Sequence, residues 1–141
     1  MVKYFTIKTP VGYLKVSACD NFVRQIQFIA SHQSTFLQAS NGILDEAKKQ
    51  LKEYFNGTRS VFHLPMKIEL APFYKKTLME VRKIKYGQKV SYSMVAKIIG
   101  SENAVRAVGT ANSKNHLHII IPCNRVVSYE WQQCGSILYT N

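Results

Sequence analysis

Residues 91–115 read SYSMVAKIIGSENAVRAVGTANSKN, and this stretch predicts two short helices joined by a tight turn. Ser91 is a natural N-cap, because its hydroxyl can accept a hydrogen bond from a free N–H group in the first turn of a helix. A first helix over Tyr92–Ile99 would end at Gly100, since glycine adopts the left-handed conformation that follows many helices. A second helix is predicted over Asn103–Ser113. This spacing is typical of a helix-turn-helix, and equally of helical hairpins that bind no DNA.

The residues after these helices lead to a cysteine. Residues 116–121 read HLHIII, a short β-branched run that predicts a buried, strand-like segment, and Pro122 ends it. Cys123 therefore emerges at the end of a rigid element. Two interpretations stay open from the local pattern: a reactive thiol, or an inert core cysteine, which is the commonest state of a free cysteine.

The first third of the chain has the pattern of a small sheet followed by a helix. The predicted strands are Val2–Lys8, Tyr13–Ala18 and Phe22–Ile29. Thr9-Pro10-Val11-Gly12 forms the first turn, because proline presets φ and glycine permits a positive φ. Residues 43–56 then switch to helical spacing, with Gly57 as the C-cap.

A third helix of the second half is predicted over residues 73–86, ended by Gly87. Together these elements predict an α+β fold with two domains. Residues 1–70 would form a small N-terminal α/β lobe, an antiparallel sheet with one helix. Residues 71–141 would form a helical C-terminal domain that contains the helix-turn-helix, at about residues 91–114.

The charge of the chain indicates the kind of partner. Its 141 residues include 19 Lys and Arg and 8 Asp and Glu, which give a formal net charge of +11 at pH 7. Residues 71–141 hold ten of these basic residues and only three of the acidic ones. The excess predicts a polyanionic partner such as nucleic acid, although a basic protein without that role is the alternative. No apolar run approaches the roughly 20 residues of a membrane span, and no signal peptide is evident, so we expect a soluble cytoplasmic protein without a membrane partner.

Cys19, Cys123 and Cys134 are an odd number of cysteines, and no C-x-x-C spacing occurs. This pattern predicts neither a disulfide framework nor a standard zinc motif. It favours an intracellular chain with one special thiol.

Four ordered blocks in the second half carry a family resemblance. They are Tyr86-Gly87-Gln88-Lys89-Val90-Ser91-Tyr92, Ala104-Val105-Arg106-Ala107-Val108-Gly109, Asn115, and Ile121-Pro122-Cys123-Asn124-Arg125-Val126-Val127. With them, residues 73–127 resemble the C-terminal domain of the O6-alkylguanine-DNA alkyltransferases, also called methylated-DNA–protein-cysteine methyltransferases. The strand-rich first lobe is similar to the more variable N-terminal domain of that family.

The resemblance implies DNA repair by a methyltransferase that acts once. Members of the family bind double-stranded DNA through the minor groove and flip an O6-alkylguanine into a pocket. They then move its alkyl group irreversibly onto a cysteine thiolate. We therefore expect a monomer that needs no cofactor and acts on DNA containing O6-alkylguanine.

The resemblance also assigns roles to single residues. Cys123 corresponds to the nucleophile, and Asn115 to the hinge asparagine that ties the recognition helix to the cysteine segment. Tyr92 resembles the tyrosine that assists flipping and lines the base pocket. Arg106 resembles the arginine finger that fills the space left by the extruded base. Val126 would offer its carbonyl to the exocyclic amine of guanine.

Further residues are assigned by their place within these blocks or between them. The other expected DNA contacts are Ser91, Ala104, Gly109 and Thr110, and Asn112 is expected to bind the substrate base. Small residues on the second helix would let its backbone approach the narrow groove. Close packing between helices is the alternative reason for them.

The sequence departs from the family at two places. Asn124, a predicted catalytic residue, stands where the family has a histidine that deprotonates the cysteine through a water molecule. A carboxamide can hold a water but cannot accept its proton near neutral pH. Because a general base is typically worth about 10²–10⁴-fold, a slower enzyme is expected unless the thiolate is favoured by other charges.

The second departure is the C-terminal segment Ser128–Asn141, which is expected to be shortened. The family continues with a glycine-rich loop and a helix carrying a glutamate, whereas this segment has only Gly135, and Glu130-Trp131 comes too early to match. A protein that binds alkylated DNA with weak or no transfer is therefore an alternative function. A thiol enzyme unrelated to DNA is a third reading, which explains neither the charge nor the helix pair.

Metal binding is not expected. Some relatives hold zinc in the N-terminal lobe, and Cys19 and His63 lie near corresponding places, but the sequence offers no complete set of four ligands. His116 and His118 are expected to be structural.

Overall fold

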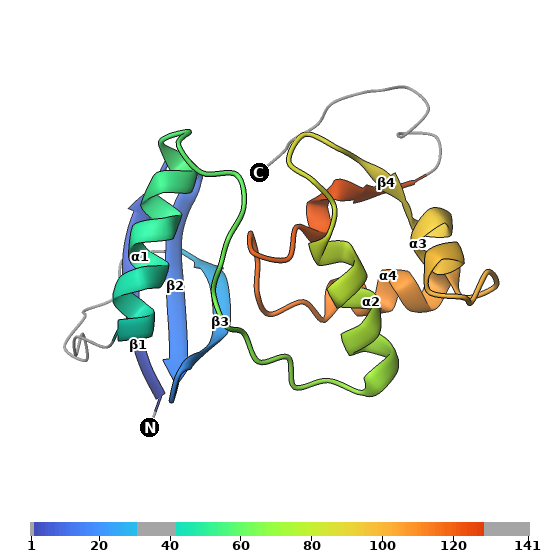
Figure 1. Cartoon of the computed structure of the whole chain (residues 1–141), viewed down its shortest axis with the longest axis horizontal. Helices are drawn as coiled ribbons and strands as arrows, with labels where there is room; N and C mark the ends of the chain where they lie inside the picture. The colour runs from blue at the N-terminus through green and yellow to red at the C-terminus, as the bar shows by residue number, and fades with distance from the viewer. Residues whose placement is uncertain (1, 31–41, 129–141) are drawn as a thin grey trace. The chain divides into compact units, whose positions relative to one another are not determined.

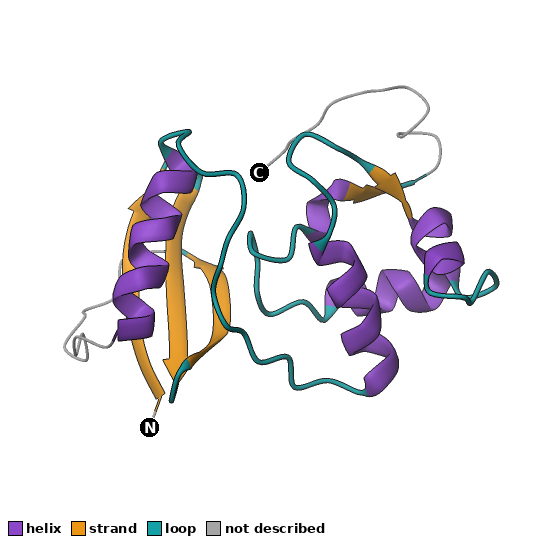
Figure 2. Ribbon diagram, viewed as in Figure 1, coloured by secondary structure: helices purple, strands orange, loops and turns teal. Residues whose placement is uncertain are grey.

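The computed structural model describes residues 2–30 and 42–128, which form two compact units (Figure 1; Figure 2). Unit 1 contains the described residues up to Ile68 together with His116–His118. Unit 2 contains Glu69–Asn115 and the described residues from Ile119 onward. None of the helices in the described part of the chain is long and apolar enough to cross a bilayer. Glu130, Trp131, Cys134 and Gly135, on which sequence arguments depend, lie outside the described residues.

Unit 1 is built on a three-stranded antiparallel sheet. Its strands are β1 (Val2–Thr9), β2 (Gly12–Cys19) and β3 (Phe22–Ile29), in the order β1-β2-β3. In the turn after β1, Gly12 has a φ of +126°, and the Thr9 hydroxyl donates a 2.6 Å hydrogen bond to the Gly12 carbonyl. The predicted strands and the predicted turn are therefore confirmed.

Helix α1 (Gly42–Phe55) packs on this sheet through one face. Its buried residues are Leu44, Ala47, Gln50, Leu51 and Tyr54. On the sheet, Leu14 and Val16 of β2 are fully buried. The predicted helix is confirmed, and Gly57 follows it with a φ of +87°.

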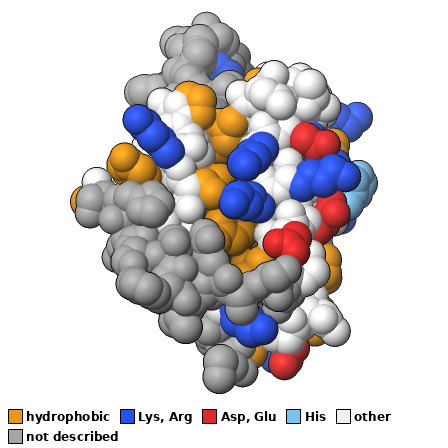
Figure 3. All heavy atoms as spheres, turned by 90° about the vertical axis from the view of Figure 1, so that its left-hand side faces the viewer, with side chains coloured by type: hydrophobic (Ala, Val, Ile, Leu, Met, Phe, Trp, Pro, Cys, Tyr) orange, Lys and Arg blue, Asp and Glu red, His pale blue; other side chains and the backbone are white. Residues whose placement is uncertain are grey.

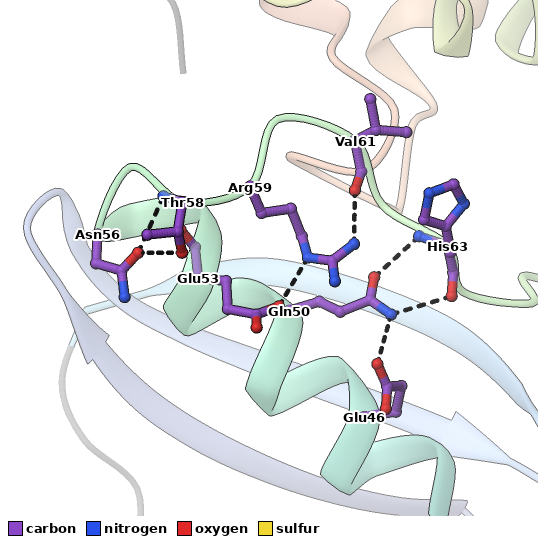
Figure 4. A network of polar contacts seen from close by, with 8 residues as sticks. All are labelled: Glu46, Gln50, Glu53, Asn56, Thr58, Arg59, Val61 and His63. Carbon is purple, nitrogen blue, oxygen red and sulfur yellow. Dashed lines mark hydrogen bonds and ion pairs between the residues drawn. The ribbon is translucent and has the colours of Figure 1, made fainter.

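Side chains of α1 hold the loop that follows it (Figure 4). The Gln50 carboxamide donates to the His63 carbonyl at 3.1 Å and to Glu46 Oε2 at 2.7 Å, and its oxygen accepts the His63 N–H at 2.9 Å. Arg59 forms a 2.9 Å ion pair with Glu53. Every polar atom of the buried Gln50 carboxamide thus has a partner, and the network fixes the loop to the helix.

The open edge of β3 pairs with a segment from much later in the chain. Ile26 N–H donates to the His116 carbonyl at 2.8 Å, and His118 N–H donates to the Ile26 carbonyl at 3.1 Å. The parallel bridge is centred on Leu117. The predicted strand over residues 116–121 is too long, because Ile119 has a φ of +77° and turns the chain. Such a φ is unusual for a β-branched residue.

Unit 2 is mainly helical. Its elements are α2 (Pro72–Arg82), β4 (Val90–Ser91), α3 (Tyr92–Ile98), α4 (Val105–Ser113), the 3₁₀ turn η1 (Cys123–Arg125) and β5 (Val126–Val127). The two short strands β4 and β5 pair in parallel. Each of the three helices packs against the other two.

Two predicted helix boundaries are wrong in unit 2. Helix α2 ends at Arg82 rather than at residue 86, because Lys83 and Ile84 donate to carbonyls only three residues back, which tightens and closes the helix. The Ile84 carbonyl then accepts a 2.8 Å hydrogen bond from Arg125. Helix α4 begins at Val105 rather than at residue 103, because Ala104 N–H donates to the Ser101 carbonyl and closes a separate turn.

The start of α3 agrees with the prediction, and its end lies one residue earlier than predicted, at Ile98. The Ser91 hydroxyl accepts the Met94 N–H at 3.1 Å, as expected of an N-cap. Gly100 follows the helix with a φ of +81°. The chain therefore turns between α3 and α4 where the sequence predicts a turn.

Candidate functional site

The backbone around Cys123 is tightly folded. Pro122 has φ −80° and ψ 69°, and Cys123 N–H donates to the Ile121 carbonyl at 2.8 Å, which together form an inverse γ-turn. The 3₁₀ turn η1 begins at Cys123 itself, and Arg125 N–H donates to the Pro122 carbonyl at 2.9 Å. The thiol of Cys123 is free and the residue is partly exposed. Cys123 is therefore not a fully buried, inert core cysteine.

Two carboxamides, one in the last turn of α4 and one two residues after the helix, contact this segment. Asn115, which is buried, donates from Nδ2 to the Ile121 carbonyl at 2.9 Å. Asn112 donates from Nδ2 to the Cys123 carbonyl at 3.0 Å. The last turn of α4 and the residue after its C-cap are thus attached to the backbone on both sides of Pro122.

The pairing of β4 with β5 places Tyr92 beside the segment that follows the cysteine. Val90 pairs with Val126 and Ser91 with Val127, so the start of α3 lies beside the strand that leaves the cysteine. Tyr92 follows Ser91 directly and is partly buried. A Cβ atom placed on Gly109 of α4 would lie 4.0 Å from Cε1 of the Tyr92 ring, an ordinary van der Waals contact. Tyr92 therefore packs over α4 at its one glycine.

The predicted DNA contacts on α4 differ in their exposure. Arg106 is exposed, and within the described residues its guanidinium makes no hydrogen bond or ion pair. Thr110 is also exposed, but its hydroxyl donates to the Arg106 carbonyl at 3.2 Å. Ala104 is the N-cap of α4 and is partly exposed. In contrast, Ser91 is only 2% exposed and its hydroxyl caps α3.

Arg125 has a structural position. It is buried, donates from Nη1 to the Ile84 carbonyl at 2.8 Å, and places its guanidinium 5.5 Å from the centre of the Tyr86 ring. Val126, the next residue, is buried in β5, and its N–H donates to the Cys123 carbonyl.

Asn124 is exposed, directly after Cys123. In the part of the chain that the structure describes, its side chain forms no hydrogen bond. A fixed contact that would hold this carboxamide in one orientation is therefore absent from that part of the chain.

The two histidines before the cysteine segment belong to unit 1. His118 lies 6.0 Å from the Phe28 ring, measured between ring centres. Burial, and to a smaller extent the charge of His116, lowers the pKa of His118 below its usual value of 6.5. Burial of His118 thus favours its neutral form.

Unit 1 offers no competing site among its described residues. Within them, no group of three or more His, Cys, Asp or Glu side chains is placed to hold a metal ion. The thiol of Cys19 contacts the carboxylate of Asp20, with Sγ 3.9 Å from Oδ2. An open depression on α1 is lined by Asp45, Lys48, Lys49, Lys52, Glu53 and Asn56. None of the predicted site residues lines this depression. On the face of the protein shown in Figure 3, basic and acidic side chains are mixed.

One role of a predicted residue was missed by sequence reasoning. Asn112 was assigned to the substrate base, whereas its amide donor is bound to the Cys123 carbonyl. The signal that could have indicated this is its spacing from Asn115, because the hydrogen bond from the Asn115 N–H to the Asn112 carbonyl continues the turn of α4 and keeps residues three apart near each other.

Comparison with known proteins gives matches over nearly the whole chain. The family model described as "6-O-methylguanine DNA methyltransferase, DNA binding domain" matches residues 72–136. The model described as "6-O-methylguanine DNA methyltransferase, ribonuclease-like domain" matches residues 2–68.

Individual relatives are similar along most of their own length. The constitutive methylated-DNA–protein-cysteine methyltransferase of Bacillus subtilis is 37% identical over 133 residues, which cover 88% of this chain and 79% of the relative. The Mycobacterium leprae methylated-DNA–protein-cysteine methyltransferase is 37% identical over 138 residues, with coverages of 96% and 84%.

Solved structures agree with this. The O6-methylguanine methyltransferase of Mycobacterium tuberculosis superposes with a TM-score of 0.82 at 29% identity, and covers 99% of this chain and 84% of its own. The same organism's OGT in complex with DNA gives a TM-score of 0.80 at 30% identity, with coverages of 91% and 80%.

Proposed function

The chain belongs to the 6-O-methylguanine DNA methyltransferase family, and from this premise we propose that Cys123 is the residue that accepts the alkyl group. The protein is a methylated-DNA–protein-cysteine methyltransferase, which repairs DNA by moving an alkyl group from guanine to a cysteine of its own chain. Binding of alkylated DNA without transfer is not favoured, because relatives 37% identical to this chain are named as methyltransferases.

The proposed reaction is a single displacement. The thiolate sulfur of Cys123 attacks the alkyl carbon on O6 of guanine, so that an S–C bond forms while the C–O6 bond breaks. The electron pair of the broken bond stays on guanine, which takes up one proton in place of the one that the thiol lost. The products are unmodified guanine and a thioether, and each molecule acts once because nothing reverses the thioether.

The observation that carries this assignment is the fixed and accessible position of Cys123. Its thiol is free and partly exposed, while its backbone is held by the γ-turn at Pro122 and by hydrogen bonds from Asn112 and Asn115. A nucleophile held in one place can meet an alkyl carbon at bonding geometry, which is worth several orders of magnitude in rate.

We propose that Tyr92 and Arg106 act on the alkylated guanine when it leaves the DNA duplex. The exposed guanidinium of Arg106 has no fixed partner in the described residues, and can occupy the space that an extruded guanine leaves. Tyr92 packs on α4 at Gly109, next to the strand pair that leads back to the cysteine. Ser91, whose hydroxyl is occupied in α3, acts by fixing the start of that helix.

Asn124 is proposed to leave the reaction without a general base at this position. Its carboxamide cannot take a proton near neutral pH. The rate then depends on the fraction of Cys123 that is already thiolate, because the thiolate is the nucleophile.

Double-stranded DNA that contains O6-alkylguanine is the proposed substrate. The charge of unit 2 supports it, because exposed lysines there can neutralise phosphates. The exposed lysines are Lys75, Lys76, Lys83, Lys85, Lys97 and Lys114. The similar M. tuberculosis OGT has been solved in complex with DNA. The protein is proposed to act as a monomer, since one cysteine completes the reaction, and to work in the cytoplasm.

Intact-protein mass after incubation with duplex DNA containing O6-methylguanine tests the proposal. One methyl adduct per molecule is expected, together with a stoichiometric loss of the lesion. Cys123→Ala should form no adduct, whereas the matched variant Cys19→Ala should react like the wild type. Undiminished transfer by a folded Cys123→Ala protein would refute the assignment.

A further inference from the structure

We infer that Asn112 is a second positioning residue for Cys123, which works together with Asn115 to fix the direction of the thiol. The inference rests on the proposed function, in which Cys123 is the alkyl acceptor. It is carried by the hydrogen bonds of two carbonyl groups, those of Ile121 and Cys123, which lie on either side of Pro122 along the chain.

Each of these carbonyls receives two hydrogen bonds of the same two kinds. The Ile121 carbonyl accepts the Cys123 N–H at 2.8 Å and Asn115 Nδ2 at 2.9 Å. The Cys123 carbonyl accepts the Val126 N–H and, at 3.0 Å, Asn112 Nδ2. A carbonyl oxygen has two lone pairs, so both acceptors are fully used. In each case one bond comes from the local backbone and one from an asparagine side chain, which belongs to α4 for the Cys123 carbonyl and lies just after α4 for the Ile121 carbonyl.

Two attachment points fix the orientation of the cysteine segment, whereas one does not. A single hydrogen bond fixes one atom of the segment but lets the segment rotate about that atom. Because Asn112 lies in the last turn of α4 and Asn115 directly follows its C-cap, their two bonds define an axis through residues 121–123. The Cα–Cβ bond of Cys123 lies between the two anchored carbonyls, so its direction is set relative to α4. The same helix carries Arg106, which is proposed to act on the DNA.

The segment needs such anchoring because its entry is strained. Ile119 has a φ of +77°, a conformation that a β-branched residue avoids. Residues in such regions persist only where the surrounding structure holds them. The path of residues 119–123 is therefore not one that the chain would keep without outside contacts.

The Asn112 carboxamide is also a poor choice for packing alone. Its Oδ1 is buried and finds no hydrogen-bond partner among the described residues. An unpaired buried acceptor is unfavourable, and an apolar side chain of similar volume would avoid it. The donor that Asn112 gives to the Cys123 carbonyl is thus the property that explains an asparagine here.

Two variants test the inference. Asn112→Asp keeps the shape of the side chain but replaces the donor by a carboxylate oxygen that faces the Cys123 carbonyl. Asn112→Ala removes the amide. Ser113→Ala is the matched control, because the Ser113 hydroxyl donates at 2.7 Å only to the Thr110 carbonyl of its own helix. Two rates are measured on each folded protein. One is single-turnover transfer from O6-methylguanine in saturating duplex DNA, and the other is alkylation of Cys123 by iodoacetamide.

A positioning role predicts that the two rates separate. Transfer should fall about 10–100-fold in Asn112→Ala and further in Asn112→Asp, since misplacement of a reacting atom by about 1 Å costs rates of this order. Alkylation by iodoacetamide, a small reagent free to approach the sulfur, should change less than about threefold. Affinity for DNA and the Ser113→Ala rates should stay close to wild type.

Several results would overturn the inference. Wild-type transfer in either folded Asn112 variant would exclude a positioning role, and so would equal losses in both rates with a lowered melting temperature. If Asn112→Asp does not fold, Asn112→Ala decides by the same ratio of rates. Failure of the proposed function itself is distinguishable, because wild-type protein would then carry no alkyl group on Cys123.

Discussion

The two units each contain a carboxamide that holds a backbone segment, and they use it differently. In unit 1, the Gln50 amide bonds to both the N–H and the carbonyl of His63 and to Glu46, so all its polar atoms are paired. In unit 2, the Asn112 amide bonds to the Cys123 carbonyl, and its buried oxygen has no hydrogen-bond partner among the described residues. Local rules of polar pairing are broken more often at functional sites than elsewhere. We therefore interpret the Gln50 contacts as ones that maintain the fold, and the Asn112 contact as one that serves the reaction.

The largest expected effect tests that separation. Asn115→Ala should lower the single-turnover transfer rate by roughly 100-fold, because it frees the Ile121 carbonyl and displaces the cysteine segment. Gln50→Leu should leave the rate of the folded protein unchanged, while it lowers the free energy of unfolding by about 1–3 kcal/mol through unpaired groups of His63. Transfer kinetics and urea denaturation of both variants check this. A rate loss in Gln50→Leu as large as in Asn115→Ala would contradict the separation.

The next effect concerns Arg106, which we propose contacts the DNA. Arg106→Ala should slow repair of duplex DNA by about tenfold or more, because the side chain no longer fills the space of the extruded base. Reaction with free O6-benzylguanine, which needs no extrusion, should change little. Lys49→Ala, an exposed basic residue of unit 1, serves as the control. Equal losses on both substrates would mean that Arg106 is only structural.

A smaller effect is expected at Asn124. Without a general base there, the transfer rate should rise with pH as more thiolate forms, and show no separate inflection near pH 6–7, where a histidine titrates. Asn124→His should raise the rate near neutral pH by a few-fold and introduce that inflection. Single-turnover rates from pH 5 to 10 for both proteins provide the measurement. A wild-type profile that is flat from pH 6 upward would contradict a thiolate-limited reaction.

The smallest effect belongs to unit 1. Burial lowers the pKa of His118, so the unfolded chain binds a proton more readily than the folded chain. Stability is therefore complete above the unfolded pKa of about 6.5 and declines as the pH falls below it, by at most about 1.4 kcal/mol per pH unit. His118→Phe should flatten this dependence in urea denaturation between pH 5 and 7.5. An unchanged slope in the variant would assign the dependence to other groups.

What the sequence could predict was decided by local rules. Strand β3 agrees with its predicted range, because β-branched and aromatic residues and flanking turns define it without outside help. Ser91 was identifiable as an N-cap for the same reason, since its partner is only three residues away. The Cys123, Asn115, Tyr92 and Arg106 assignments came from the family resemblance, and their roles stay predictions.

What the sequence could not predict depends on distant contacts. The early end of α2 is linked to Arg125, which binds the Ile84 carbonyl from 41 residues further along the chain. The strand predicted over residues 116–121 is cut short by the positive φ of Ile119, which no pattern of isoleucines indicates. The contact between Asn112 and Cys123 spans 11 residues and a change of direction at Pro122, and only the folded unit brings these groups together.

The location of the transferred group in the wild-type protein tests most directly whether Cys123 is the alkyl acceptor. The protein is reacted to completion with duplex DNA that carries isotopically labelled O6-methylguanine, digested, and mapped by peptide mass spectrometry. We expect the label on the sulfur of Cys123, at one per molecule, and none on Cys19 of unit 1. A label on Cys19, or on any residue other than Cys123, would contradict it.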